Sequence, residues 1–236
     1  MKVVGIIQAR MDSSRFPSKM KATLGDLSII EWVILRVKKA KLIDCIVLAT
    51  SDEEQDNHLV KLANKYEISH YRGSKLNVLD RTVKAATEYR ADHVVRICAD
   101  NPFICFDVLD NLIEYYKQSK CDLVFNHSPL FNSNFADGFG AEMLSIKTLY
   151  KVFNEANLPL HEEHVTKYIY DNHTKFNICT PPCPSELSFP NLKFDVDKMD
   201  DLKKLNRLLK NCKIKIDTTA KDILNNYSNN YSDNSI

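Results

Sequence analysis

The sequence predicts an α/β fold of a single domain, in which a mostly parallel twisted sheet is flanked by helices. The run Val3–Ile7 is short, apolar and rich in β-branched residues, as expected for a strand buried on both faces of a parallel sheet. Strand-like and helix-like segments then alternate, which predicts right-handed βαβ units. A chain of 236 residues can bury one core without a second domain. We therefore expect a domain over residues 1–225 and a disordered tail over 226–236.

The first half of the chain alternates regularly between the two kinds of element. Gly25 marks a turn before residues 28–40, where apolar positions cover most of a helix surface. The run at 45–50, Cys-Ile-Val-Leu-Ala-Thr, is typical of a second buried strand. A segment with an acidic start at 53–66 is the next helix, and residues 67–71 are a third strand.

The middle of the chain continues this alternation. Asn77 can cap a helix that runs to Glu88. Residues 93–99 are apolar enough for another buried strand, a helix is expected over 107–117, and a strand over 122–125. These elements extend the parallel sheet.

A polar loop over residues 8–19, called here the signature loop, follows the first strand directly. It carries three cations, Arg10, Arg15 and Lys19, and the adjacent serines Ser13 and Ser14. Open α/β folds bind ligands at the carboxyl end of the sheet, and these side chains are donors for phosphate oxygens. The loop therefore predicts a polyphosphate site, although a solvated basic turn would have the same composition. It has neither glycine-rich phosphate pattern, which argues against a P-loop or dinucleotide-binding domain.

Two aspartates follow predicted strands that are distant in the sequence. Asp100 ends the strand at 93–99, and Asp197 ends a segment at 192–197 whose alternating polarity predicts a strand before a helix at 199–209. Mg²⁺ takes one or two carboxylates together with phosphate oxygens and waters. We expect both carboxylates to converge on one Mg²⁺, although an aspartate that starts a turn explains Asp100 locally.

These motifs resemble those of the cytidylyltransferase family that includes CMP-KDO synthetases, CMP-sialic acid synthetases and the SpsF-like spore coat polysaccharide proteins. Residues 7–19 are similar to its signature [IP]-[QP]-A-R-x-x-S-x-R-x-P-x-K, and Gln8 resembles the SpsF branch. Residues 96–104 resemble R-I-T-G-D-x-P-L-I, with Ala99 in place of glycine. The resemblance implies a nucleotide-diphospho-sugar transferase fold of the GT-A type, with CTP as substrate and a homodimeric assembly.

The resemblance also implies roles for individual residues. The catalytic set, whose aspartates are also the metal ligands, is Arg15, Lys19, Asp100 and Asp197. The nucleotide-binding set is Gln8, Ala9, Arg10, Ser13, Ser14, Arg72, Ser74 and Asp80. The acceptor-facing set is Asp137, Gly138, Glu142, Glu163 and His164. Acceptor specificity is expected in the loop at 126–135, at Phe131, Asn132, Asn134 and Phe135.

For several of these residues a purely structural role, without contact to a substrate, stays open. Arg72 equally fits a surface turn, and Asp80 equally fits a local ion pair with Arg81. His164 is either a general base or a structural histidine. The run H-E-E-H at 161–164 lacks the four-residue histidine spacing of a zinc-binding helix.

Composition limits the possible partners and surroundings. A net charge of +1 disfavours nucleic acid as a main partner. The sequence has no apolar run of membrane-spanning length and no signal-peptide pattern at its start. Its seven cysteines form no C-x-x-C pair, so we expect free thiols in a reducing cytoplasm.

The sequence thus predicts a Mg²⁺-dependent cytidylyltransferase in surface polysaccharide or glycan precursor synthesis. It would move CMP from CTP to an acidic sugar or a phosphorylated small molecule and release pyrophosphate. The alternative is a GT-A glycosyltransferase that uses a nucleotide sugar, because Asp195-Val196-Asp197 matches D-x-D. Such motifs normally lie mid-chain, and the signature loop has no counterpart there. A non-catalytic nucleotide-binding subunit is a further alternative, in which loss of the two aspartates would be expected.

Overall fold

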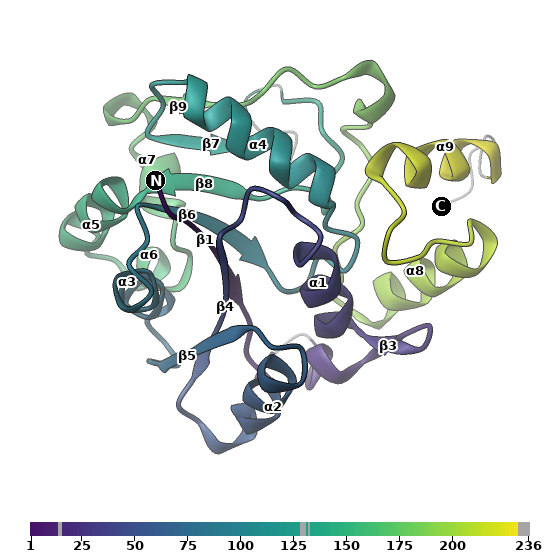
Figure 1. The fold of residues 1–236 in the computed structure, drawn as a ribbon, viewed down its shortest axis with the longest axis horizontal. Coiled ribbons are helices and arrows are strands. Elements are labelled where there is room, and N and C mark those ends of the chain that lie inside the picture. Colours follow the sequence, from purple (N-terminus) through teal and green to yellow (C-terminus); the bar gives the residue numbers. More distant parts are fainter. Residues whose placement is uncertain (14–15, 128–130, 132, 231–236) are drawn as a thin grey trace.

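The computed structural model describes residues 1–13, 16–127, 131 and 133–230, and within them a seven-stranded sheet of order β5-β4-β1-β6-β8-β7-β9 forms the centre (Figure 1). The strands are β1 (Val3–Gln8), β4 (Cys45–Ser51), β5 (Ser69–Gly73), β6 (His93–Cys98), β7 (Leu123–Phe125), β8 (Glu142–Ser145) and β9 (Ile178–Cys179). β8 runs antiparallel to both of its neighbours, and the other pairs are parallel. The predicted α/β class with a mostly parallel sheet is confirmed.

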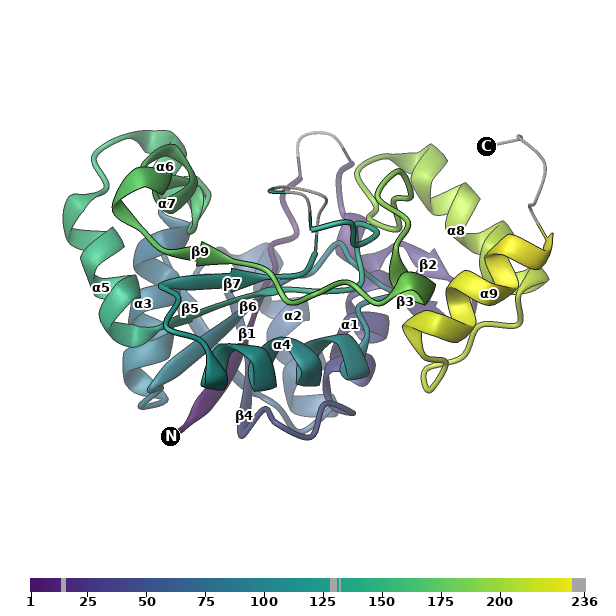
Figure 2. The same cartoon turned by 90° about the horizontal axis from the view of Figure 1, so that it is seen from above.

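Helices cover both faces of the sheet and leave the carboxyl ends of β1 and β6 open. One face packs against α1 (Ile29–Val37), α2 (Asn57–Lys65) and α4 (Phe106–Gln118), and the apolar cluster on this face continues into α8 (Met199–Asn211) and α9 (Ala220–Asn230). The other packs against α3 (Val78–Glu88), α5 (Ile146–Glu155) and α7 (Lys167–Asp171), and α6 (Pro159–Glu163) lies beside α7. Figure 2 shows α6 and α7 at one end of the molecule and α8 and α9 at the other.

Alternation along β1 explains the two apolar layers. Val3 and Ile7 belong to the cluster under α1 and α4, whereas Val4 and Ile6 belong to the cluster under α3 and α5. Successive side chains of a strand point to opposite faces, so an uninterrupted apolar run suits a central strand with two covered faces. The buried position predicted for this run is confirmed.

Short elements complete the architecture. The 3-10 helices are η1 (Lys19–Lys21), η2 (Glu54–Asp56), η4 (His173–Lys175) and η5 (Ser185–Leu187), and β2 (Thr23–Leu24) pairs with β3 (Leu27–Ser28) in an antiparallel hairpin. Gly25 lies in the hairpin turn with φ of +61°, a conformation that glycine adopts without steric cost. The turn predicted at this glycine is confirmed.

Two predictions near the C-terminus need correction. Residues 192–197 are extended, but among the described residues their only β-pairing is one isolated bridge, between Asp137 and Lys193, so the predicted strand is wrong. Residues 226–230, which the sequence assigned to a tail, belong to α9, where the ring of Tyr227 lies 6.2 Å from that of Phe194. Residues 231–236 lie outside the described residues, and the domain limits stay a prediction.

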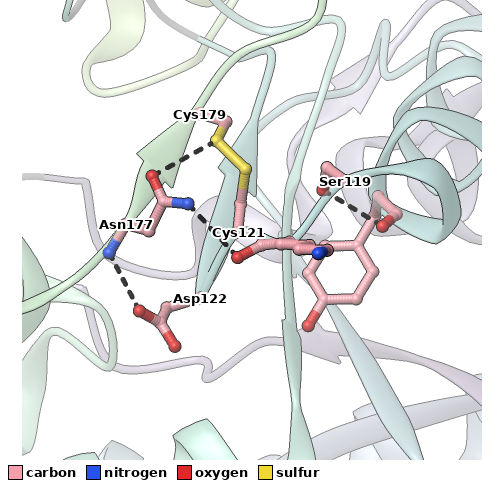
Figure 3. Close-up of a disulfide and its surroundings, with 7 residues drawn as sticks. Ser119, Cys121, Asp122, Asn177 and Cys179 are labelled. Atoms are coloured by element: carbon pink, nitrogen blue, oxygen red, sulfur yellow. Dashed lines mark hydrogen bonds between the residues drawn. A yellow bond between two sulfur atoms is a disulfide. The ribbon is translucent and has the colours of Figure 1, made fainter.

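A disulfide joins Cys121, just before β7, to Cys179 in β9, with their Cα atoms 6.0 Å apart (Figure 3). A hydrogen bond joins the same two segments next to the disulfide: the backbone N–H of Asn177 donates to Asp122 over 2.9 Å. The prediction that all cysteines are free thiols is therefore wrong for this pair. A disulfide requires Cα atoms within about 7 Å of each other, and a separation of 58 residues gives no local sign of such proximity.

No helix in the described part of the chain is long and apolar enough to cross a membrane.

Candidate active site

A pocket of about 340 Å³ lies at the carboxyl ends of β1 and β6, between the signature loop, the first turn of α3 and the residues that follow α6. Most of its lining is polar. It gathers these predicted site residues: Gln8, Ala9, Arg10, Ser13, Lys19, Asp100, Glu163 and His164. Ser14 and Arg15 lie outside the described residues, so their predicted roles stay predictions.

Lys19 joins the two predicted metal-binding aspartates. It lies in η1 and is 7% exposed. Its ammonium donates to Asp100 Oδ2 over 3.1 Å and to the carbonyl of Val196 over 2.7 Å, and it lies 3.9 Å from Asp197 Oδ1. The backbone N–H of Val196 also donates to the carbonyl of Asp100 over 2.9 Å. The structure therefore brings together the two carboxylates that the sequence separates by almost a hundred residues.

The donor set around Lys19 suits Mg²⁺ bound together with a polyphosphate. Both carboxylates are about one third exposed and approach one cationic group. Within the described residues no group of three or more His, Cys, Asp or Glu side chains could hold a metal. Two carboxylates with phosphate oxygens and waters completing the shell are a typical magnesium arrangement. Asp100 and Asp197 thus suit the predicted metal, for which substrate and solvent would have to supply the remaining ligands.

Asp137 lies beside this centre and not in the pocket. Burial and the neighbouring Asp195 carboxylate raise the pKa of Asp137 to about 6, against the opposing effect of Lys193, whose ammonium is 3.7 Å away. Burial, together with Asp100 and Asp197, also raises the pKa of Asp195. These carboxyl groups form a region of concentrated negative charge next to the proposed metal site.

Gly138 is required by close backbone contact in the same region. Its φ is +103°, and a Cβ there would lie 3.0 Å from the carbonyl carbon of Phe194. At Gly140 a Cβ would collide with the backbone and side-chain oxygens of Asn126. The tight backbone expected from two nearby glycines is therefore present, but it brings residues 137–140 against the segment that carries Asp195, away from the pocket.

Glu142 is buried in a hydrogen-bonded network and does not line the pocket. Its carboxylate accepts hydrogen bonds from Arg96 Nη1 over 2.8 Å, from Thr166 Oγ1 over 2.8 Å and from Tyr170 OH over 2.7 Å. Burial disfavours ionisation, but the charge of Arg96 keeps the pKa of Glu142 below its usual value. The acceptor role of Glu142 therefore stays a prediction, and its partner Arg96 lines the pocket.

Gln8 connects this network to the nucleotide side of the pocket. Its side-chain oxygen accepts from Arg96 Nε over 3.0 Å, and its amide donates to Thr82 Oγ1 over 2.7 Å. The last residue of β1 is therefore held between β6 and α3.

The segment over residues 158–171, called here the arm, closes one side of the pocket. Glu163 accepts from Arg10 Nη2 over 3.3 Å, and Arg10 also donates weakly to the carbonyl of Lys75 over 3.4 Å. His164 ends α6 and lines the pocket. In contrast, His161 is buried and lies 3.1 Å from Asp171, so the H-E-E-H run does not act as one motif.

The other nucleotide-side predictions lie outside the pocket. Arg72 donates to the carbonyls of Ser51 and Glu53 and to the side chain of Asn57, which gives it a structural role at the turn after β4. Ser74 accepts from the backbone N–H of Asn77 and lines a separate shallow hollow beside Asp80.

Asp80 does not pair with Arg81. Its carboxylate lies 2.8 Å from the ammonium of Lys84, one turn further along α3, so the local ion pair considered for the sequence is wrong. Asn77 does cap this helix, because its side chain accepts from the backbone N–H of Asp80.

Arg81, Arg96 and Cys98 also line the pocket, although none of them is in the predicted catalytic, nucleotide-binding or acceptor-facing sets. The signal for Arg96 is a charged residue inside an otherwise apolar strand, where a partner is required. For Arg81 the sequence suggested a local ion pair, and only the folded structure shows that its side chain lines the pocket.

The sheet topology, the cationic loop and the paired carboxylates define a nucleotidyltransferase. A family profile described as "Cytidylyltransferase" matches residues 4–229, and the chain belongs to this family. The predicted family and the predicted class of enzyme are therefore confirmed.

Individual relatives agree with this assignment. The chain is 34% identical over 203 residues to an uncharacterized protein of Methanocaldococcus jannaschii, covering 86% of this chain and 81% of that one. It is 27% identical to the spore coat polysaccharide biosynthesis protein SpsF of Bacillus subtilis, covering 94% and 92%. A solved cytidylyltransferase from Leptospira borgpetersenii superposes with a TM-score of 0.90 at 28% identity, covering 100% of this chain and 99% of the other.

Proposed function

We propose that the protein transfers CMP from CTP, with Mg²⁺, to an acidic sugar or a phosphorylated small molecule and releases pyrophosphate. The observation that carries this proposal is the convergence of Asp100 and Asp197 on Lys19 beneath the signature loop. The printed name of the Bacillus subtilis relative supports a place in surface polysaccharide or glycan precursor synthesis.

In the proposed site the triphosphate lies against the signature loop. Lys19 is tied to two carboxylates, so phosphate oxygens would compete with them for its ammonium. Arg10 is held by Glu163 at 3.3 Å, a contact loose enough for a phosphate to replace. Both cations are therefore available to a polyanion while being held in place before it binds.

Asp100 and Asp197 would hold the metal. When bound, Mg²⁺ neutralises charge on the transferring phosphoryl group and lowers the pKa of an attacking hydroxyl. The two aspartates hold this charge at a fixed position, and the signature-loop cations stabilise the departing pyrophosphate. Because the metal would lower the pKa of the attacking hydroxyl, the reaction would need little general-base catalysis by a side chain.

The acceptor would enter from the arm. Glu163 and His164 reach the pocket from this side, and Arg96 offers a buried guanidinium held by Glu142. A hydroxyl, carboxylate or phosphate of the acceptor could accept from such a group. We assign His164 to positioning the acceptor, with general-base catalysis as the second role.

The Asp100→Asn variant tests the proposal. The substitution removes a metal-binding charge at nearly constant volume, so we expect pyrophosphate release to fall by at least about 10²-fold, the scale of losing one electrostatic stabiliser. The assay follows pyrophosphate with Mg²⁺, each of the four NTPs and a panel of sugar acids and phosphorylated small molecules. Asp200→Asn is the matched control, because Asp200 is 83% exposed on α8. Full activity of Asp100→Asn with CTP would refute the role of this residue.

The assay also separates the alternatives. Release that needs CTP and one acceptor supports a cytidylyltransferase and identifies its substrate. Turnover of a nucleotide sugar with no release from CTP would favour a GT-A glycosyltransferase. The family match opposes that alternative. A cytoplasmic location stays a prediction.

A further inference from the structure

The ammonium of Lys19 lies where a cation shared by Asp100 and Asp197 would lie. It is 3.1 Å from Asp100 Oδ2 and 3.9 Å from Asp197 Oδ1, and it donates to the carbonyl of Val196 over 2.7 Å. Carboxylate and carbonyl oxygens are also the ligands that suit Mg²⁺. The chain therefore places a cation of its own among the oxygens of the proposed metal site.

The fold fixes the position of this lysine. Lys19 begins η1, where its backbone N–H donates to the carbonyl of Phe16 over 3.1 Å and its carbonyl accepts from the backbone N–H of Ala22 over 2.9 Å. Its side chain is only 8% exposed. The next residue, Met20, is buried in the apolar cluster under α1 and α4. The contact with the carboxylates is thus part of the packed structure, unlike a loose ion pair on the surface.

A cation at this position opposes the binding of a second one. The ammonium compensates part of the charge of Asp100 and Asp197 and occupies the carbonyl oxygen of Val196. Mg²⁺ on the same carboxylates would lie next to the ammonium, where like charges repel strongly because the groups are partly buried. Either cation can therefore use these oxygens, but the two cannot use them together.

Phosphate oxygens are the alternative partners for Lys19. The residue lines the same pocket as Arg10 and Ser13. A lysine ammonium is a point charge on a flexible four-carbon stem, so it can change partners while the backbone stays in place. A triphosphate in this pocket would accept hydrogen bonds from the ammonium and draw it away from Asp100. The carboxylates would thus be released where phosphate oxygens, the other ligands of Mg²⁺, lie beside them.

We propose that Lys19 excludes a divalent metal ion from Asp100 and Asp197 until a nucleoside triphosphate draws its ammonium away. Metal and nucleotide then bind only together. This inference rests on the proposed function, which supplies the triphosphate and the metal, and it adds the order in which the site is filled.

Titration of the full-length protein with Mn²⁺ alone tests the exclusion. Mn²⁺ accepts the same oxygen ligands as Mg²⁺, and its electron paramagnetic resonance signal measures the free ion. Lys19→Met keeps an unbranched stem and removes the charge. We expect this variant to bind one Mn²⁺ at least about 10-fold more tightly than the wild type, a usual size for coupling between sites. Equal binding of Mn²⁺ by the wild type and the variant would overturn the proposal.

Two further variants identify the site of the bound ion. Lys21→Met is the matched control, because Lys21 ends the same 3-10 helix and is exposed, and its affinity for Mn²⁺ should equal that of the wild type. In the double variant Lys19→Met with Asp197→Asn, the gain in affinity should disappear because one carboxylate is lost. A gain that persists in the double variant would place the ion elsewhere and refute the proposal.

A second variant and a measurement on the wild type keep the test decisive if Lys19→Met does not fold. Lys19→Gln is neutral but retains a donor for the carbonyl of Val196, and it should show the same gain. In the wild type, Mn²⁺ should bind to the complex with CTP at least about 10-fold more tightly than to the protein alone or to CTP alone. Binding of Mn²⁺ to the protein alone as tight as to the complex would overturn the proposal.

The two proposals fail in different ways. A gain in Mn²⁺ affinity in Lys19→Met, without pyrophosphate release by the wild type from any nucleotide and acceptor, would refute the proposed reaction and leave the role of Lys19 intact. Pyrophosphate release by a wild type that binds Mn²⁺ alone as tightly as Lys19→Met does would overturn the role of Lys19 alone.

Discussion

Asp137 shows how one carboxyl group is altered by burial beside like charge. Its side chain is 22% exposed, and its pKa is raised from 3.8 to about 6, chiefly by burial and then by Asp195. Because the pKa is higher in the folded state, that state binds the proton more tightly. The free energy of unfolding therefore falls as the pH rises from about 4 to about 6.

We expect Asp137→Asn to be more stable than the wild type above pH 6, by up to about 3 kcal/mol, because the amide avoids the buried charge. The difference should shrink as the pH falls below 6 and should vanish near pH 4. Urea unfolding at several pH values measures this, with Asp200→Asn as the exposed control. A difference that stays constant across this range would contradict the assigned ionisation.

At the scale of elements, the Glu142 network holds the arm to the sheet. Glu142 lies in β8, Arg96 in β6 and Tyr170 in α7, while Thr166 directly precedes α7. Their hydrogen bonds therefore join two antiparallel strands and the helix that leads into the pocket wall. The same carboxylate fixes the guanidinium of Arg96, which lines the pocket.

Replacing Glu142 by Gln leaves the buried Arg96 charge uncompensated. We expect the free energy of unfolding to fall by about 3–5 kcal/mol, the usual effect of breaking a buried ion pair. The double variant Arg96→Met with Glu142→Leu should recover much of this loss, because neither charge remains. Denaturant titration distinguishes the cases, and a single variant within about 1 kcal/mol of the wild type would contradict the network's role.

The same scale shows which elements the sequence could reveal. Apolar runs predicted β1, β4 and β6, because strands covered on both faces need no polar positions. β9 has two residues and α9 is rich in Asn, so neither has a strong local signal. The extended segment before α8 alternates in polarity like a strand, yet it does not form the regular series of backbone hydrogen bonds that joins strands in a sheet.

The sequence predicted that Asp100 and Asp197 converge, and the structure confirms that both carboxylates approach Lys19. Only Asp100 follows a strand of the sheet, so the rule that ligands bind where strands end explains its position and not that of Asp197. Arg72 and Arg81 both lie near Gly73, but their side chains point in different directions. Arg72 donates hydrogen bonds to the turn after β4, whereas Arg81 lines the pocket. That direction depends on tertiary contacts, which no local pattern encodes.

At the scale of the whole molecule, exposed apolar side chains on α5 and the arm support the expected homodimer. Phe153 is 36% exposed, Leu158 52% and Leu160 47%. Sedimentation of the wild type should give twice the chain mass of 27.1 kDa. Leu160→Glu should shift the protein toward the single-chain mass, since an interface core excludes unpaired charge. Leu76→Glu, at a residue 75% exposed on another surface, is the control, and a wild type of single-chain mass would refute dimerisation.

The disulfide closes residues 121–179, which include the arm, into a covalent ring. β8, α5 and the whole arm lie between Cys121 and Cys179, whose Cα atoms are 6.0 Å apart. A protease that cuts inside the ring leaves a single molecule until a reductant is added. Both ends of the ring are fixed at the same edge of the sheet. We therefore expect that the segment between the two cysteines can be replaced by the corresponding segment of a homologous chain. Under the proposed function, such an exchange would replace the acceptor-facing residues of the arm and keep the signature loop and Asp100.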